Sequence, residues 1–160
     1  MKHQEKIEDK LKDAEKFLKN TNHLINVTYP LVEDGKLLLG VVENLFLAST
    51  CSIESLLILE RSKKNIPPFH DSFESKYRVF NENILQKYRF DEKELETIRE
   101  IKDILMKHKE SSIEFSRKEK FVIWDDDYDA TTLKYDKVKH FYNIVNTFYN
   151  KVKALVKNND

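Results

Sequence analysis

Glycine, proline and cysteine are scarce in this chain of 160 residues, which contains two Gly, three Pro and one Cys. All-β folds need turn residues at short intervals, so the scarcity of Gly and Pro favours long helices. The lone Cys51 lies in an apolar stretch and excludes an intramolecular disulfide framework. We therefore expect a reducing compartment, with Cys51 as a buried structural thiol and not a nucleophile.

An excess of charge of either sign is also missing, because 28 basic residues balance 28 acidic ones. A neutral total removes the argument for a general nucleic-acid or membrane-surface binder and leaves only a local patch open. The first six residues lack the apolar region of a signal peptide, so we predict a cytoplasmic protein. With 40% hydrophobic residues, we expect one folded domain over residues 1–160 that buries roughly 70% of its unfolded surface.

One apolar stretch, from Leu37 to Leu59, is long enough to cross a bilayer. It contains Glu43 and Glu54, and a carboxylate at mid-bilayer costs at least ~2.5 kcal/mol. We therefore predict the central helix of a soluble fold, with no membrane contact. Both carboxylates are expected to be neutralised by Lys or Arg from neighbouring helices, and paired-carboxylate catalysis is the weaker alternative.

Hydrophobic periodicity predicts five helices. They cover about residues 5–28, 34–64, 71–87, 91–109 and 136–158. Pro disfavours helical geometry in the preceding residue, so the first helix should end at Tyr29 and Pro30. Capping boxes are predicted at Asp71 to Glu74 and at Asp91 to Glu94.

Two β-prone segments, Phe121 to Trp124 and Ala130 to Leu133, flank a turn-prone acidic run from Asp125 to Asp129. They predict one short hairpin before the last helix. The predicted fold class is therefore all-α: an antiparallel helical bundle of about five helices with a short β-hairpin before its last helix.

Metal-binding patterns are weak, and we predict no metal and no cofactor. The five His residues lie on separate segments without metal-ligand spacing, and there is no Cys pair. Asp125, Asp127 and Asp129 alternate as in a calcium loop, and Asp136 falls at its twelfth position, but Ala130 stands where that loop needs Gly, and the last ligand should be Glu. An acidic hairpin turn explains the run better. A glycine-rich phosphate loop is excluded because Gly35 and Gly40 are the only glycines.

A short basic run, Arg117, Lys118 and Lys120, provides candidate nucleic-acid-binding residues. Three aromatic residues lie beside it in the sequence: Phe115, Phe121 and Trp124. Interleaved cations and aromatic rings often hold single-stranded nucleic acid. The alternative is a solvated loop, because neighbouring glutamates dilute the positive charge.

Several segments together resemble the HEPN superfamily (higher eukaryotes and prokaryotes nucleotide-binding domains). Phe46 to Leu57 is similar to the core helix of that family, with small residues and Glu54 at helical spacing. Pro67 to Asp71 is similar to the break that follows it, and the last helix to the family's closing helix. The resemblance spans about residues 10–156 as a pattern of parts, and it implies an all-α fold.

Many HEPN proteins are metal-independent ribonucleases that carry an Arg, usually with a polar neighbour, followed after four to six residues by His. The matching residues here are Lys102, Asp103 and His108, with Lys in place of the Arg. Arg99 lies too far from His108 to substitute. The resemblance also implies a homodimer and a nucleotidyltransferase-type protein partner.

The change from Arg to Lys matters because RNA cleavage needs a proton shuttle, for which His108 suits, and a cation at the phosphate. Lys lacks the planar bidentate fork of Arg. The leading hypothesis is a catalytically degenerate HEPN-like module that binds nucleic acid, a nucleotide or a partner protein. The alternatives are a ribonuclease using Lys102 and His108, and a plain helical scaffold, in which His108 is simply favoured by the helix dipole.

Overall fold

Helices and one small sheet make up the chain in the computed structural model, which describes residues 2–159. The helices are α1 (Lys2–His23), a π-helical turn (Leu24–Thr28), α2 (Tyr29–Val32), α3 (Lys36–Ser62), α4 (Phe73–Asn83), α5 (Glu92–Glu110) and α6 (Tyr135–Asn158). The strands are β1 (Ile113–Arg117), β2 (Lys120–Trp124) and β3 (Ala130–Lys134). Because α1, the π turn and α2 form one continuous segment, the described chain has five main helical segments, as predicted.

The first helical segment continues past Pro30, so the predicted end at Tyr29 and Pro30 is wrong. A Pro ring clashes with the carbonyl four residues earlier in a regular helix. The chain widens into a π turn instead, in which the backbone N–H of Tyr29 donates to the carbonyl of Leu24. The segment ends at Val32, after which Glu33 adopts a left-handed conformation with φ 52° and bonds back to Tyr29.

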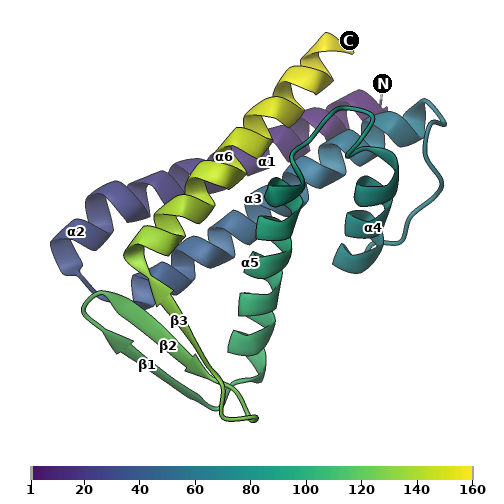
Figure 1. Ribbon diagram of the computed structural model, residues 1–160. Coiled ribbons are helices and arrows are strands. Elements are labelled where there is room, and N and C mark those ends of the chain that lie inside the picture. The colour runs from purple at the N-terminus through teal and green to yellow at the C-terminus, as the bar shows by residue number, and fades with distance from the viewer. Residues whose placement is uncertain (1, 160) are drawn as a thin grey trace.

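Helix α3 is the core helix, and its position matches the prediction. Buried hydroxyls of Ser49, Ser52 and Ser55 donate to carbonyls of the same helix, so they add no unsatisfied polar groups. In length and composition α3 could cross a membrane, and 56% of its apolar window is buried within the molecule, as in a core helix. Figure 1 shows α1, α3 and α6 running alongside one another while α5 crosses them.

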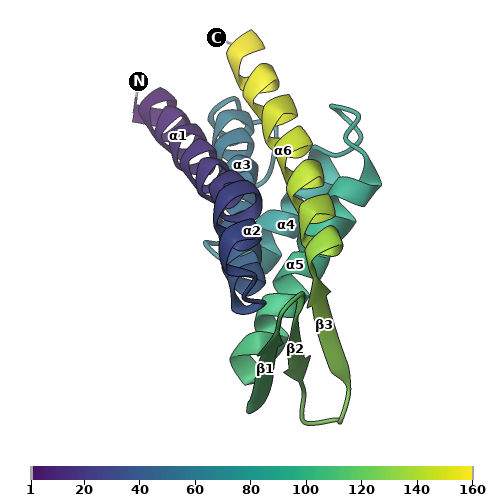
Figure 2. The same cartoon turned by 90° about the vertical axis from the view of Figure 1, so that its left-hand side faces the viewer.

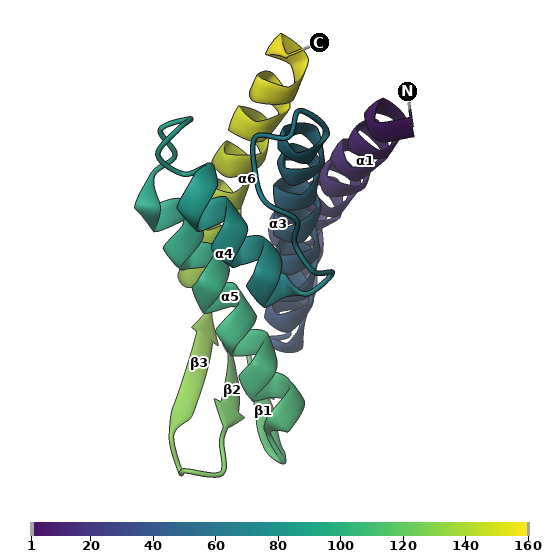
Figure 3. The same cartoon turned by 90° about the vertical axis from the view of Figure 1, so that its right-hand side faces the viewer.

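Two hydrophobic clusters occupy the two ends of the molecule, and α3 and α6 contribute to both. At the end near the sheet, Phe121, Ile123 and Leu133 pack with residues of α3 and α6. At the other end, the rings of Phe80, Phe90 and Phe148 meet with centroid distances of 5.2 to 5.6 Å. Figure 3 shows α4 and α5 together on one side of α3, where they cover this second cluster.

The predicted hairpin is part of a three-stranded antiparallel sheet with strand order β1-β2-β3. Strand β1 was not predicted, and its pairing with β2 sets Ile113 opposite Trp124 and Arg117 opposite Lys120. The fold is therefore mostly helical and not strictly all-α. Figure 2 shows the sheet below α2 and the start of α6, at the end of the molecule away from both termini.

Of the two predicted capping boxes, the one that opens α5 is confirmed. The Asp91 carboxylate accepts from the backbone of α5 while Glu94 reaches back to the Asp91 N–H. The box at Asp71 is wrong by one residue, because Ser72 caps α4 by accepting from the Ser75 N–H. Asp71 instead accepts a 2.6 Å hydrogen bond from Lys76.

Candidate nucleic-acid interface

The face of the sheet that points away from the helices combines basic and apolar residues in three cross-strand rows. Successive residues of a strand point to opposite faces, and Phe121, Ile123 and Leu133 face the helical core. The alternate positions, whose side chains point the other way, form what we call the outer face. Its rows are Arg117, Lys120 and Lys134 (the basic row), then Phe115, Val122 and Thr132, and finally Ile113, Trp124 and Ala130.

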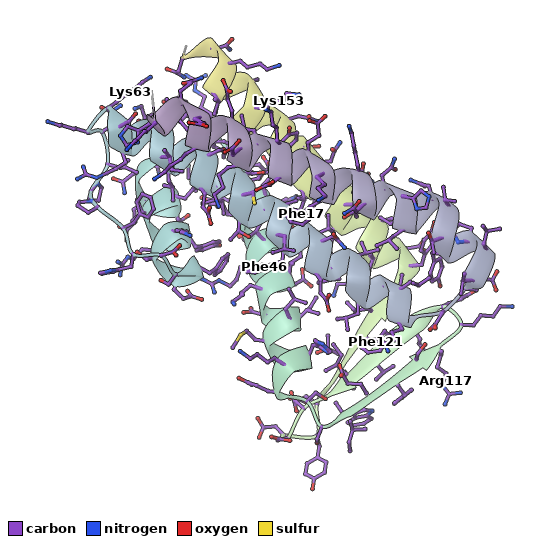
Figure 4. The ribbon with its side chains drawn as sticks, turned by 180° about the vertical axis from the view of Figure 1, so that it is seen from behind. Phe17, Phe46, Lys63, Arg117, Phe121 and Lys153 are labelled. Atoms are coloured by element: carbon purple, nitrogen blue, oxygen red, sulfur yellow. The ribbon has the colours of Figure 1, made fainter. Side chains whose placement is uncertain are left out.

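Because of this alternation, the basic and aromatic residues that are neighbours in the sequence do not all lie on the same face of the sheet. Phe121 is 5% exposed and belongs to the core, so its predicted place beside the cations is wrong. Figure 4 shows Arg117 extending from the sheet away from the helices, whereas Phe121 lies between the sheet and the helices. Lys118 lies in the β1–β2 turn, where its Nζ is 3.1 Å from Glu33. Lys134 completes the basic row and was missed.

A hollow of about 870 Å³ adjoins the basic row, between the β1–β2 turn, α2 and the start of α6. Its lining includes four basic side chains (Arg117, Lys118, Lys120, Lys134) and three acidic ones (Glu33, Glu119, Asp136), a difference of one positive charge. Its floor includes the rings of Tyr29 and Tyr135, stacked with centroids 4.5 Å apart. The Tyr29 hydroxyl donates to the Lys118 carbonyl at 2.9 Å, which fixes the turn against α2.

Two contacts from the α2–α3 turn hold the β1–β2 turn in place. The Gly35 N–H donates to the Arg117 carbonyl at 3.1 Å. The Ser116 hydroxyl donates to Asp34 at 2.6 Å, and this bond, followed by one from the Lys36 N–H, lowers the pKa of Asp34. A side chain at position 35 has no room, because its Cβ would lie 2.1 Å from the Lys120 carbonyl oxygen. These contacts hold the backbone of the β1–β2 turn, and with it the basic row, in a fixed position.

The residues predicted as catalytic lie on α5 but have separate surroundings. The Lys102 ammonium lies 5.1 Å from the ring centroid of Phe46 and 5.6 Å from that of Phe73. Asp103 is exposed. His108 faces β1 instead, with Nδ1 2.7 Å from the Glu114 carboxylate. Six helical residues turn the side chain by roughly 600°, so Lys102 and His108 point about a third of a turn apart.

The carboxylates of α3 have different partners. Glu54 meets Lys10 at 2.6 Å and Lys76 at 2.8 Å, as predicted. Glu43 is exposed, and within residues 2–159 it has no ion pair, so its predicted neutralisation is wrong.

Glu60 is fully buried, and its role was not predicted from the sequence. It accepts from Tyr88, from Asn65 at 2.8 Å and from Lys87 at 3.0 Å. These bonds join the end of α3 to the segment after α4, which identifies Glu60 as a structural residue. Its position directly after a run of buried leucines is the signal that could have revealed it.

Other candidate chemistry has a structural explanation. The Asp125 carboxylate accepts from the backbone N–H groups of Asp127 and Asp129 at 2.9 and 3.0 Å, so it organises the acidic turn. Across residues 2–159, the structure brings no three metal-ligating side chains together. Burial raises the pKa of the Cys51 thiol to about 11, which opposes a role as a nucleophile.

Evidence for a function therefore comes from this chain's own geometry, above all from the outer face of the sheet and the adjoining hollow. Comparison of the chain with protein-family models, with curated proteins and with solved structures gives no match.

Proposed function

We propose that this chain is a nucleic-acid-binding module that holds the phosphate backbone on its basic row and does not cleave it. The observation that carries the proposal is the direct opposition of three cations, Arg117, Lys120 and Lys134, across three strands. Like charges directly opposite one another destabilise a sheet. Within residues 2–159 none of the three has an ion pair with a carboxylate, so the row suits a ligand that supplies negative charge at regular intervals.

Nearby features support a nucleic acid over other polyanions. The aromatic side chains of Phe115 and Trp124 are partly exposed on the same face, and simple polyanions offer no surface that stacks on such rings. The total charge of the protein is zero, so the attraction is local to this face. We expect modest affinity that falls steeply with salt.

Kinship with the HEPN superfamily belongs to the same proposal, as a catalytically degenerate, cytoplasmic relative with a bundle-like helical body. Its support is the sequence pattern together with the central position of α3. Lys102 replaces the family's Arg and lies against Phe46 and Phe73, away from His108. The two groups therefore do not converge on one phosphate within a single chain. A homodimer, or a nucleotidyltransferase-type partner, is the assembly that this kinship implies.

The test replaces all three residues of the basic row by Gln and measures binding of labelled RNA and DNA oligonucleotides across a salt series. Each lost phosphate contact should lower the slope of log K against log salt by ~0.7 on a single strand, so the triple variant should lose about 2. The matched control is Lys12→Gln, Lys16→Gln and Lys19→Gln on the exposed side of α1, which makes the same change in total charge.

We expect the control to bind as the wild type does. An equal loss in both triple variants would mean that total charge, and not the basic row, attracts the ligand. Absence of binding in the wild type would contradict the proposal and leave the helical-scaffold alternative. Light scattering on the same samples tests the implied homodimer.

A second candidate function, metal-independent RNA cleavage, is favoured by one contact. A histidine held by a carboxylate at one ring nitrogen can transfer a proton at the other, and His108 is held by Glu114 in this way. RNA incubated in a chelator with wild type, His108→Ala and Lys102→Arg distinguishes the two functions. We expect no cleavage by any of them. Cleavage by the wild type and by Lys102→Arg that His108→Ala abolishes would replace the binding proposal with the ribonuclease.

A further inference from the structure

We infer that the ligand of the outer face is single-stranded nucleic acid, two neighbouring bases of which stack on Phe115 and Trp124. This inference rests on the proposed function and specifies its ligand. The basic row alone would accept any phosphate backbone. The two rows beside it decide what kind of strand fits.

The two rings are placed for neighbouring bases. Phe115 and Trp124 are 38% and 36% exposed and are diagonal neighbours across the β1–β2 pair. Diagonal neighbours lie about 7 Å apart, within reach of aromatic side chains. Between the rings, Val122 on β2 is 6% exposed, and on β3 the same two rows end in the small residues Thr132 and Ala130.

The phosphate contacts and the rings lie side by side, which suits a single strand. Rows are roughly 6.6 Å apart because a strand rises about 3.3 Å per residue. A strand that starts on the basic row and runs along β1 and β2 can therefore place one base over Phe115 and the next over Trp124, one row further on. The bases of a duplex are already stacked on each other and are not available to these rings.

Charge sets the extent of the site. The guanidinium of Arg117 lies 5.6 Å from the Phe115 ring centroid, where it can contact a phosphate and one face of a stacked base together. At the opposite end of the sheet, the acidic turn from Asp125 to Asp129 repels phosphate. The strand should therefore end at Trp124, which lies in the last row before the acidic turn.

The charges of the outer face argue against a second copy of the chain as its occupant. A second copy would bring its own basic row to the contact and bury like charges against each other. A single strand supplies the opposite charge and the planar groups at once. The two occupants therefore predict different results in solution.

Trp124 is the only tryptophan in the sequence, so its fluorescence reports directly on the site. Titration with a ten-nucleotide oligo(dT) or oligo(U) should quench this fluorescence, and a ten-base-pair duplex should bind at least tenfold more weakly without quenching. Phe115→Ala should weaken single-strand binding about tenfold. Phe115→Leu keeps an apolar side chain for folding and should show the same loss, whereas Phe115→Trp should retain affinity.

Tyr128→Ala is the matched control, because Tyr128 is 88% exposed on the acidic turn and lies outside the three rows. It should leave affinity unchanged. Equal binding of single strand and duplex, with unaltered fluorescence and with Phe115→Leu behaving like Tyr128→Ala, would overturn the stacking inference. Loss of binding in the basic-row variant would then still support the proposed function, whereas no binding to either nucleic acid would remove both.

Discussion

Gly35 has a steric role that no other residue type could fill. A Cβ there would lie 2.1 and 2.6 Å from the carbonyl oxygens of Lys120 and Arg117, which belong to backbone and cannot rotate away. We expect Gly35→Ala to lower the free energy of unfolding by about 1–3 kcal/mol, as overpacking does. Urea denaturation measures the change.

Gly40 is the matched control, because a Cβ in the middle of α3 would meet nothing within 4 Å. Gly40→Ala should raise the free energy of unfolding by about 0.5–1 kcal/mol, since Gly is a poor helix former. If Gly35→Ala were as stable as Gly40→Ala, the α2–α3 turn would not be seated on the sheet as described.

Single residues were predictable where their partners are close in sequence. The Asp91 and Glu94 cap follows from such a local pattern, whereas for Glu54 only the need for basic partners was predictable, because Lys10 and Lys76 lie 44 and 22 residues away. The role of Gly35 was not predictable, because the groups that exclude a side chain lie about 80 residues away in the β1–β2 turn. Lys134 was missed for the same reason, since its place in the basic row depends on strand register.

Glu60 links the end of α3 to the segment after α4, and it should make the free energy of unfolding depend on pH. Burial alone would raise the pKa of its carboxyl, but hydrogen bonds from Tyr88, Asn65 and Lys87 outweigh burial and lower it. Its contribution is therefore complete above the unfolded pKa near ~4.3 and is lost as pH falls through the folded pKa. Glu60→Gln should lower the free energy of unfolding by about 3 kcal/mol at pH 7. In urea denaturation at pH 3.5 the difference should shrink, and a constant difference would contradict this role.

Glu94, at the start of α5, should show the opposite dependence. One carboxylate oxygen accepts from the Asp91 N–H, and within residues 2–159 the other is buried without a partner. Burial raises the pKa of this carboxyl, so its stabilising effect is complete below the unfolded pKa and is lost as pH rises through the folded pKa. Glu94→Gln keeps the cap and removes the charge, and should raise stability at pH 7 by about 1 kcal/mol. A variant less stable at pH 7 than at pH 4, relative to wild type, would contradict this account.

At the scale of elements, amphipathic periodicity predicted α3 and α6 well, because each buries a broad apolar face along its whole length. Strand β1 was missed because its short, partly charged sequence becomes a strand only by pairing with β2. The alternation of Ile113 and Phe115 with Glu114 and Ser116 was its available signal. The π turn could not be predicted, because Pro30 permits either a helix end or a widened turn.

The two hydrophobic clusters should unfold together, because α3 and α6 pass through both. Trp124 fluorescence reports on the sheet end, and far-UV circular dichroism reports on the helices. We expect the two signals to give the same midpoint in urea, as a two-state transition requires. A fluorescence transition at lower urea would show that the sheet end unfolds by itself.

At the scale of the whole molecule, the way α5 crosses α3 could not be predicted from the sequence. Helical faces can be derived from periodicity, but crossing angles depend on how side chains of distant helices interlock. The candidate site was predictable only in part for the same reason. The basic run from Arg117 to Lys120 could be recognised in the sequence, but the contribution of Lys134 and the division into an inner and an outer face depend on strand pairing.

The sheet has cations in its first row and carboxylates in the turn at its far end, roughly 16 Å away at about 3.3 Å per residue. In a molecule of zero formal net charge, such separated charges give the sheet an electric dipole. It gains little long-range pull toward a polyanion, but the field of that polyanion rotates it. Approach to a charged polymer would thus orient the sheet before first contact, so that productive encounters begin at Arg117, Lys120 and Lys134.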